Sequence, residues 1–453
     1  MTVLLQIGRR PPDPPPPADD PDLRVFHSSV GAHVFVVDGS RIYDLPQGLA
    51  PSAVVEALRS DPGPRRIDGR PLPPPPLYAL SLNVLQACNM SCGYCYADEG
   101  RFGGPARAMT ADTARAAVDR LIAESAPGSD VVVGFMGGEP LLARELVHEV
   151  TGYASAAAAV AGRRARFAIT TNLTTVSPAD ARLFAEHGFA VSVSVDGPPD
   201  RHDAVRRMRG DASAYALMAA GLDVLRRHGR PRHLGARVTV TPRTGRLLPV
   251  LDHVIGLGFD EVGFAAVLAS PDRSLAIPDG EFAGLLDDVV ECGERALAEL
   301  SAGRRYPFGN FETAMHQLHR GSHRPYPCGG GAAYLSAGAE GDLFTCHRFV
   351  DDPAHAMGTV QDGVDDAARA RHLERGHVDR MSPCRSCWAR YLCGGGCYHE
   401  VSRRGRPGCD YIRGWLDFCL RAYAELSTAN PGYFASSPTP AGVPGSDPTT
   451  VAR

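Results

Sequence analysis

The chain lacks the sequence features that mark membrane, secreted and nucleic-acid-binding proteins. No run approaches the roughly 18 consecutive apolar residues that a membrane-spanning helix requires, and the longest candidate, around 154–161, is short and rich in alanine. The N-terminus reaches Arg9 and a proline run too soon for the apolar segment of a secretory signal. A formal net charge of −4 supplies no basic excess for nucleic acid. We therefore expect a cytoplasmic protein with neither a membrane nor a nucleic-acid partner.

The rest of the composition is that of an ordinary globular protein, except for the cysteines. Apolar residues make up 44% and charged residues 22% of the 453 residues, a length that suggests two or three domains. In a cytoplasmic chain, twelve cysteines indicate metal or redox chemistry rather than disulfides. Three of them lie within 88–95 and eight lie between Cys328 and Cys419, whereas Cys292 stands apart in a predicted helix.

Changes in composition divide the chain into five parts. The Pro- and Asp-rich start, 1–23, is expected to be disordered. A small α+β unit at 24–70 precedes a stiff proline-rich linker. Strand and helix patterns alternate over 77–305, and a glycine- and cysteine-rich region follows at 306–426. The tail at 427–453 is rich in Ser, Pro, Thr and Gly and is expected to be disordered.

The alternating part predicts a parallel sheet. Helical stretches separate six strand-like runs, and Thr110 and Ser177 are suited to cap two of these helices. Six such units with right-handed crossovers suffice for an open, partial (βα)6 barrel, but not for a closed barrel of eight. The strand-like runs are 80–86, 131–136, 167–172, 190–196, 235–241 and 261–267.

The first predicted strand leads directly into Cys88, Cys92 and Cys95, with the spacing C-x3-C-x2-C. Active sites of such barrels lie at the carboxyl ends of the strands. Three thiolates can hold three irons of a four-iron cluster, which leaves the fourth iron open to a small molecule. A zinc site is the alternative, although zinc prefers a fourth ligand and paired C-x2-C spacing.

Polar residues follow or line several of the other strands. Two adjacent glycines after the second strand permit a close approach of the backbone, although an ordinary turn would look the same. In the fourth strand, serines and an aspartate share one face and valines share the other, which is unusual for a buried parallel strand. Arg237 in the fifth strand either binds a ligand or makes a structural ion pair. The candidate binding residues are Gly137, Gly138, Glu139, Asn172, Ser194, Asp196 and Arg237.

Together these motifs resemble those of radical S-adenosylmethionine (SAM) enzymes, including the aromatic Tyr94 before the last cysteine. The resemblance implies that Cys88, Cys92 and Cys95 hold a catalytic [4Fe-4S] cluster whose open iron binds SAM. One electron would then cleave SAM to a 5′-deoxyadenosyl radical that abstracts a substrate hydrogen. It also implies that Tyr94 and the candidate binding residues contact the cofactor, with Arg237 at its carboxylate.

The C-terminal cysteines resemble the SPASM extension, which carries two auxiliary four-iron clusters in peptide-modifying radical enzymes. A pair of zinc ribbons is the alternative. We prefer Cys409 to Cys419 as a ligand, because Cys409 falls at a helix start and Cys419 falls inside the helix. The ligand sets that the resemblance implies are Cys384, Cys387, Cys393 and Cys409 for one cluster, and Cys328, Cys346 and Cys397 for the other. The second set lacks a fourth cysteine, so its cluster has an open iron or another ligand such as His323.

The same resemblance implies a peptide or protein substrate. It is strongest for the maturation proteins of quinohaemoprotein amine dehydrogenase, which form thioether crosslinks. We therefore expect side-chain crosslinking of a ribosomal precursor peptide, three clusters, and an electron donor such as flavodoxin or ferredoxin. The unit at 24–70 is a candidate peptide-binding element, because an extended peptide can add a strand to an exposed sheet edge.

Two alternatives remain. Formylglycine formation, the reaction of anaerobic sulfatase maturases, is the first. Those enzymes carry an Asp after the position of Cys346, where this chain has His347. A non-enzymatic iron–sulfur electron carrier or zinc scaffold is the second. It would explain the cysteines but not the Gly-Gly motif or the polar strand faces.

Overall fold

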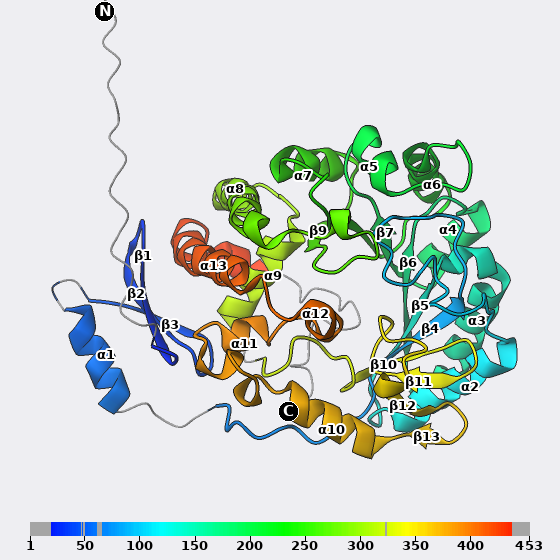
Figure 1. Ribbon diagram of the computed structural model, residues 1–453, viewed down its shortest axis with the longest axis horizontal. Helices are drawn as coiled ribbons and strands as arrows, with labels where there is room; N and C mark the ends of the chain where they lie inside the picture. Colours follow the sequence, from blue (N-terminus) through cyan, green and yellow to red (C-terminus); the bar gives the residue numbers. More distant parts are fainter. Residues whose placement is uncertain (1–19, 47, 49, 61–65, 322–323, 437–453) are drawn as a thin grey trace, which may run out of the picture.

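The computed structural model describes residues 20–46, 48, 50–60, 66–321 and 324–436. A sheet of ten strands lies at its centre, in the order β13-β12-β11-β10-β4-β5-β6-β7-β8-β9 (Figure 1). Neighbours from β4 to β9 are all parallel, which confirms the predicted partial (βα)6 barrel. These six strands are β4 (Ala79–Leu85), β5 (Val131–Gly137), β6 (Ala165–Thr171), β7 (Ala190–Ser194), β8 (His233–Val240) and β9 (Glu261–Ala266).

Helices cover the outer face of the parallel strands, where the valines, leucines and phenylalanines of the core are buried (Figure 1). The predicted caps are present, because Thr110 and Ser177 each accept a hydrogen bond from a backbone N–H of the following helix. Strand β7 alternates as expected, with Val191 and Val193 buried on the helix side. The helices are α2 (Ala111–Glu124), α3 (Arg144–Val160), α4 (Pro178–Glu186), α5 (Pro199–Val205), α6 (Ala214–His228) and α7 (Leu247–Gly256).

The cysteine-rich region continues the same sheet. Strand β10 (Tyr334–Ala337) pairs in parallel with β4, and three short strands extend it in antiparallel fashion. The predicted division at 305/306 therefore does not separate two sheets. The short strands are β11 (Asp342–Phe344), β12 (Ala356–Thr359) and β13 (Gly363–Val364).

Long helices join the barrel to the C-terminal region. Helix α13 (Cys409–Ala429) packs on α8 (Phe282–Ser301) and α9 (Gly309–Arg320). A Cβ at Gly293 would clash with the Phe418 ring, so glycine permits the close α8–α13 approach. The other helices here are α10 (Asp366–Gly376), α11 (Arg390–Cys393) and α12 (Tyr398–Arg404). The 3₁₀ turns are η1 (Pro140–Ala143), η2 (Arg273–Leu275), η3 (Asp279–Glu281), η4 (Pro353–His355), η5 (Val378–Arg380) and η6 (Cys384–Ser386).

The expected disorder at 427–453 is wrong for its first ten residues. Helix α13 runs to Ala429, and α14 (Gly432–Ser436) follows. Phe434 stacks on His319 with ring centroids 4.4 Å apart, so aromatic contacts with α9 hold this segment. The rest of the tail lies outside the described residues.

None of the helices in the described ranges is long and apolar enough to cross a membrane.

A small antiparallel sheet forms the N-terminal unit, in the order β1 (Leu23–Ser28), β2 (Gly31–Val36) and β3 (Arg41–Asp44). Helix α1 (Pro51–Ser60) follows it, and the sheet lies beside α13 (Figure 1). The expected disorder at 1–23 is wrong for its last residues, because Asp20 accepts a hydrogen bond from Leu23 and Asp22 contacts a buried arginine. Residues 1–19 lie outside the described part of the chain.

Candidate active site at the mouth of the barrel

The loop of Cys88, Cys92 and Cys95 begins at the carboxyl end of β4. Met90 donates its backbone N–H to the Cys88 Sγ at 3.4 Å, and Cys95 donates to the Cys92 carbonyl at 3.1 Å. Burial raises the pKa of Cys88 to about 11 and that of Cys92 to about 12, and the neighbouring thiols add to both shifts. The three thiols therefore lie together in a site where a thiolate needs compensating positive charge, which a bound metal supplies.

The Gly137-Gly138 turn packs directly against this cysteine loop. Gly138 donates to the Leu85 carbonyl at 2.9 Å, and the next N–H, of Glu139, donates to the Ala87 carbonyl at 3.0 Å. A Cβ at Gly138 would clash with the Ala87 carbonyl and lie 2.8 Å from the Cys88 nitrogen. The turn is thus a cradle that any side chain would fill, rather than an ordinary surface turn.

The Glu139 carboxylate is buried and already carries protein partners. It accepts hydrogen bonds from the Asn172 backbone at 2.7 Å, the Thr171 hydroxyl at 2.7 Å and the Leu141 backbone at 3.0 Å. Burial raises its pKa to about 7 against these hydrogen bonds. A carboxylate offers about four acceptor positions, so this arrangement leaves about one for a ligand. The Asn172 side chain lies 3.9 Å from the Cys88 Sγ.

Tyr94 and Asp196, both expected to contact the cofactor, bond to each other. The Tyr94 hydroxyl donates to the Asp196 carboxylate, which also accepts from Thr239 N at 2.8 Å. Arg206 completes this group: its Nε donates to Asp196 at 2.8 Å, and its guanidinium lies 5.3 Å from the Tyr94 ring centre. These contacts hold the cysteine loop against β7 and β8.

Sequence reasoning missed Arg206. Its guanidinium lowers the pKa of Cys88 and Cys92, in opposition to the larger effect of burial. It is 9% exposed and paired with the buried Asp196, so it is the positive charge that the chain itself places beside these thiols. No local motif marked it, because the chain holds many arginines and this one follows the end of α5, far along the chain from the cysteine loop.

Arg237 lines a cavity of about 860 Å³ between β8, β9 and the C-terminal region. Within the described ranges its guanidinium has no hydrogen-bond or ion-pair partner, so the structural ion pair that was the alternative is not formed there. A Cβ at Gly263 would lie 2.7 Å from the Arg237 Nη1, which shows that a glycine leaves room for this side chain. Ser194 is paired with Arg237 in the sheet register and is partly buried.

The C-terminal thiols form two further groups. Charges on neighbouring thiols raise the pKa of Cys328 and Cys346 beyond the effect of burial, and the partners include Cys397. The same holds for Cys384, Cys393 and Cys409, whose thiol partners include Cys387. The chain thus brings together both predicted sets, Cys328, Cys346 and Cys397 on one side and Cys384, Cys387, Cys393 and Cys409 on the other.

Cys419 has different surroundings. Burial alone raises its pKa, and it lies on the core face of α13, whereas Cys409 begins that helix.

His323, the possible extra ligand, lies outside the described residues. All twelve cysteines are free thiols. No three His, Cys, Asp or Glu side chains in the described part of the chain are placed to hold a single metal ion. Each thiolate of a four-iron cluster binds a different iron, so that finding concerns single-ion sites rather than clusters.

Comparison with known families agrees with this geometry. Residues 82–244 match the family model of the Radical SAM superfamily. The chain carries a radical SAM domain. This confirms the prediction of a radical SAM enzyme, and the matched residues include the cysteine loop, the Gly-Gly turn and Arg237.

Relatives of this radical SAM chain include maturases. It is 24% identical to the serine-type anaerobic sulfatase-maturating enzyme of Klebsiella aerogenes, over 78% of this chain and 86% of that protein. The corresponding enzyme of Bacteroides thetaiotaomicron is also 24% identical, over 74% of this chain and 87% of that protein.

Two solved structures have the same fold. One is anSMEcpe with AdoMet bound, with 18% identity, a TM-score of 0.65 and coverage of 80% of this chain and 98% of that chain. The other is Streptococcus suis SuiB bound to the precursor peptide SuiA, with 14% identity, a TM-score of 0.50 and coverage of 86% and 97%.

The radical SAM domain touches the C-terminal region through Tyr96, the residue after Cys95. Its ring centre lies 6.2 Å from that of His347, which follows Cys346, and 5.8 Å from that of His399, close after Cys397. The Arg348 guanidinium lies 4.9 Å from the same ring. One tyrosine thus connects the barrel thiols with the group of Cys328, Cys346 and Cys397.

Proposed function

We propose that the protein reductively cleaves SAM and uses the resulting radical to modify a side chain of a peptide or protein. The observation that carries this proposal is the cysteine loop packed on the Gly-Gly cradle. Arg237, whose guanidinium has no partner among the described residues, lies on β8 of the same sheet and lines the cavity toward the C-terminal region. A thiol triad, a close backbone and a free cation are the donor set that an iron–sulfur cluster and the amino-acid part of SAM require.

In this proposal Cys88, Cys92 and Cys95 hold the catalytic cluster. When bound, the cluster and SAM supply one-electron cleavage of the sulfonium to methionine and a 5′-deoxyadenosyl radical. Arg237 binds the SAM carboxylate, because a guanidinium forms paired hydrogen bonds with carboxylates. Asp196 and Arg206 orient the cysteine loop rather than touch the cofactor, since their polar atoms already bond to Tyr94 and to each other.

We further propose two auxiliary [4Fe-4S] clusters, which makes three in all. The compact thiol group that includes Cys409 would hold one of them. The group of Cys328, Cys346 and Cys397 would hold the other, with one iron open or bound by another ligand. The arginines that line the same cavity, among them Arg348 and Arg406, supply positive charge beside these thiols.

The proposed substrate is a ribosomal precursor peptide, and the electron donor is a small protein such as flavodoxin or ferredoxin. Support comes from the solved structures of this fold that contain a peptide, SuiA in one case and the Cp18Cys peptide in another. Strand β3 pairs with β2 alone among the described strands, and Tyr43 on it is 43% exposed. We assign the capture of the peptide to this edge.

The proposed product is a thioether or another side-chain crosslink. Formylglycine formation is the second candidate, and the relatedness to sulfatase-maturating enzymes favours it. His347 counts against it: its Nδ1 lies 3.0 Å from the Tyr334 hydroxyl, and burial lowers its pKa to about 3. Sulfatase maturation uses an aspartate at this position, and this chain supplies an imidazole there instead of that carboxylate.

The decisive test of the proposed function is 5′-deoxyadenosine formation. The anaerobically reconstituted protein is reduced with dithionite in the presence of SAM, and the product is measured by mass spectrometry. A variant with Cys88, Cys92 and Cys95 changed to Ala should form none, whereas Cys292→Ala, a matched change of a thiol in α8, should behave as wild type. Equal product from the wild type and the triple variant would refute the proposal.

The bond formed is tested on candidate peptides with the same protein. A thioether replaces one C–H and one S–H with a C–S bond, so the peptide loses two hydrogens and keeps its sulfur. Formylglycine made from cysteine loses the sulfur and gains an aldehyde, which hydrazide reagents capture.

The capture site is tested with a Tyr43→Glu variant. If this variant binds the peptide as tightly as wild type in fluorescence anisotropy, the edge of β3 is excluded as the capture site.

A further inference from the structure

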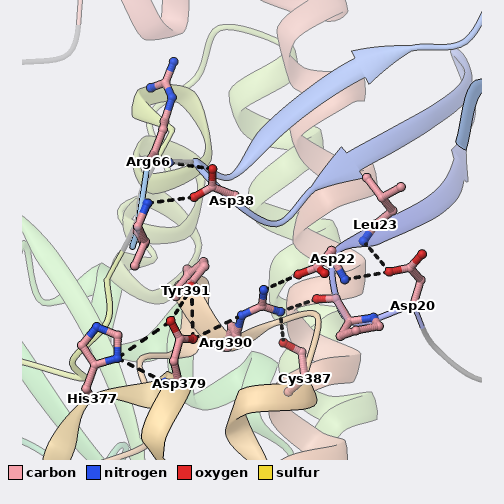
Figure 2. A network of polar contacts seen from close by, with 12 residues as sticks. Asp20, Asp22, Leu23, Asp38, Arg66, His377, Asp379, Cys387, Arg390 and Tyr391 are labelled. Carbon is pink, nitrogen blue, oxygen red and sulfur yellow. Dashed lines mark hydrogen bonds and ion pairs between the residues drawn. The ribbon is translucent and has the colours of Figure 1, made fainter. Parts of the chain in front are cut away.

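One buried arginine connects the N-terminal sheet with the auxiliary thiols (Figure 2). Arg390 begins α11, between Cys387 and Cys393, and is 8% exposed. Its guanidinium donates hydrogen bonds to the Asp22 carboxylate at 2.5 Å and to the Pro21 carbonyl, just before β1. It also donates to the Cys387 carbonyl at 3.2 Å. The segment that precedes β1 therefore reaches the backbone of a proposed cluster ligand through one side chain.

Arg390 also pairs with Asp379, which lies 3.5 Å from its Nε. The Tyr391 hydroxyl donates to the same carboxylate at 2.8 Å. A buried cation needs counter-ions, because its loss of hydration is costly. Here one counter-ion, Asp22, comes from the N-terminal unit, and the other comes from the C-terminal region. Counter-ions from both regions therefore meet at this one guanidinium.

A second contact supports the same connection. Trp388, next to Cys387, lies beneath Arg24 of β1 at 4.5 Å and beside Phe35 of β2 with ring centres 6.2 Å apart. Arg24 is itself paired with Asp417 of α13 at 2.6 Å. Arg390 and Trp388 line the same cavity as Cys384 and Cys387. The sheet thus packs against the chain that carries these thiols as well as bonding to it.

We propose that Arg390 is a positioning residue that makes the N-terminal sheet part of the auxiliary site of Cys384, Cys387, Cys393 and Cys409. By holding the Cys387 carbonyl it fixes the loop between two ligands, and its charge lies beside the group. A peptide that docks on β1–β3 and moves Asp22 would change that charge. Deleting the N-terminal unit would also remove Asp22, so the effect would not be limited to peptide binding. The inference rests on the proposed function in one respect, that these thiols hold a cluster.

The first test is a reductive titration of the auxiliary cluster in the full-length holoprotein, followed by electron paramagnetic resonance. Added positive charge stabilises the more negative, reduced cluster. Asp22→Asn, which removes a counter-ion, should therefore raise the midpoint potential, and Arg390→Gln should lower it. Arg390→Lys, which keeps the charge without the planar fork, should fall between Arg390→Gln and wild type. Asp44→Asn is the control on the same sheet, because Asp44 is 90% exposed and pairs with His33.

The second test needs no cluster. Hydrogen–deuterium exchange in the cluster-free protein should be faster for β1 and for residues 384–393 in both Asp22→Asn and Arg390→Gln, and unchanged in Asp44→Asn. Wild-type potentials and exchange in both variants would overturn the inference. The exchange result does not depend on SAM cleavage, so failure of the inference and failure of the proposed function are distinguishable. If Arg390→Gln binds no auxiliary iron, that loss supports the positioning role. The midpoint potential of the auxiliary cluster is then measured in Asp22→Asn alone.

Discussion

The thiols at the barrel mouth and the thiols of the C-terminal region are positioned by different means. Cys88, Cys92 and Cys95 come from one short loop that a glycine turn and one buried ion pair hold in place. Cys328, Cys346 and Cys397 come from three separate segments, brought together by β10, the turn after β11 and the start of α12. The first group depends on local geometry and the second on the whole fold, so the two should respond differently to substitution.

The largest difference is expected from Gly138→Val. The new side chain must displace the Ala87 carbonyl and the Cys88 nitrogen, so the barrel loop should lose its iron while the auxiliary groups keep theirs. A shift of this size at a reacting group typically costs roughly 100-fold or more in rate. Iron content and 5′-deoxyadenosine formation measure the two effects. Gly152→Ala in α3, where an added Cβ meets no atom within 4 Å, is the control. Loss of iron from all sites alike would contradict the separation of the two groups.

A smaller difference is expected between two arginines. Arg206→Met leaves the buried Asp196 charge without its partner, which should lower the free energy of unfolding by about 3 kcal/mol. Arg348→Met breaks the pair with Glu400, whose side chains are 28% and 18% exposed, and should cost about 1 kcal/mol. Urea unfolding of the cluster-free proteins measures both. Equal losses would mean that burial does not distinguish the two sites.

The preference for Cys409 over Cys419 as a cluster ligand predicts a difference in metal content between their variants. Cys409→Ala should remove iron from the group of Cys384, Cys387 and Cys393, because Cys409 is the thiol of α13 that lies next to them. Cys419→Ala should keep the iron and cost about 1 kcal/mol for the small cavity left in the core. Iron and sulfide analysis decides between them. Loss of iron in Cys419→Ala alone would reverse the assignment.

A pH dependence is the last expected difference at the barrel mouth. Burial, with the nearby Arg206, lowers the pKa of His202 to about 4, and its Nδ1 accepts the Asp196 N–H at 3.3 Å. Between about pH 6.5 and pH 4 the unfolded chain binds more protons than the folded one. The free energy of unfolding therefore falls as the pH falls through this window, by on the order of 1–3 kcal/mol from this residue. Urea unfolding at pH 7 and pH 4.5 should show a weaker decline in His202→Asn.

Local signals made the barrel and its cysteine loop predictable from the sequence. Buried valine runs, caps such as Thr110 and the C-x3-C-x2-C spacing all act over a few residues, and the structure reproduces the strands to within about two residues. The ion pair of Asp196 and Arg206 was not predictable, because nothing near either residue shows that a loop returns to it. The ordered ends of the chain were missed for the same reason. Proline-rich composition indicated disorder at Asp22, while the partner that orders it, Arg390, lies far along the chain.

The shared sheet has a consequence for how the chain folds. Strand β4 carries the cysteine loop, and its outer edge is covered by β10, which is synthesised some 250 residues later. Pairing over such a long separation is slow, and an unpaired edge can join other chains. During synthesis the barrel must therefore wait with an open edge until residue 337 leaves the ribosome. We expect a chain truncated before Tyr334 to aggregate, and productive folding to depend on a chaperone that shields this edge until β10 is made.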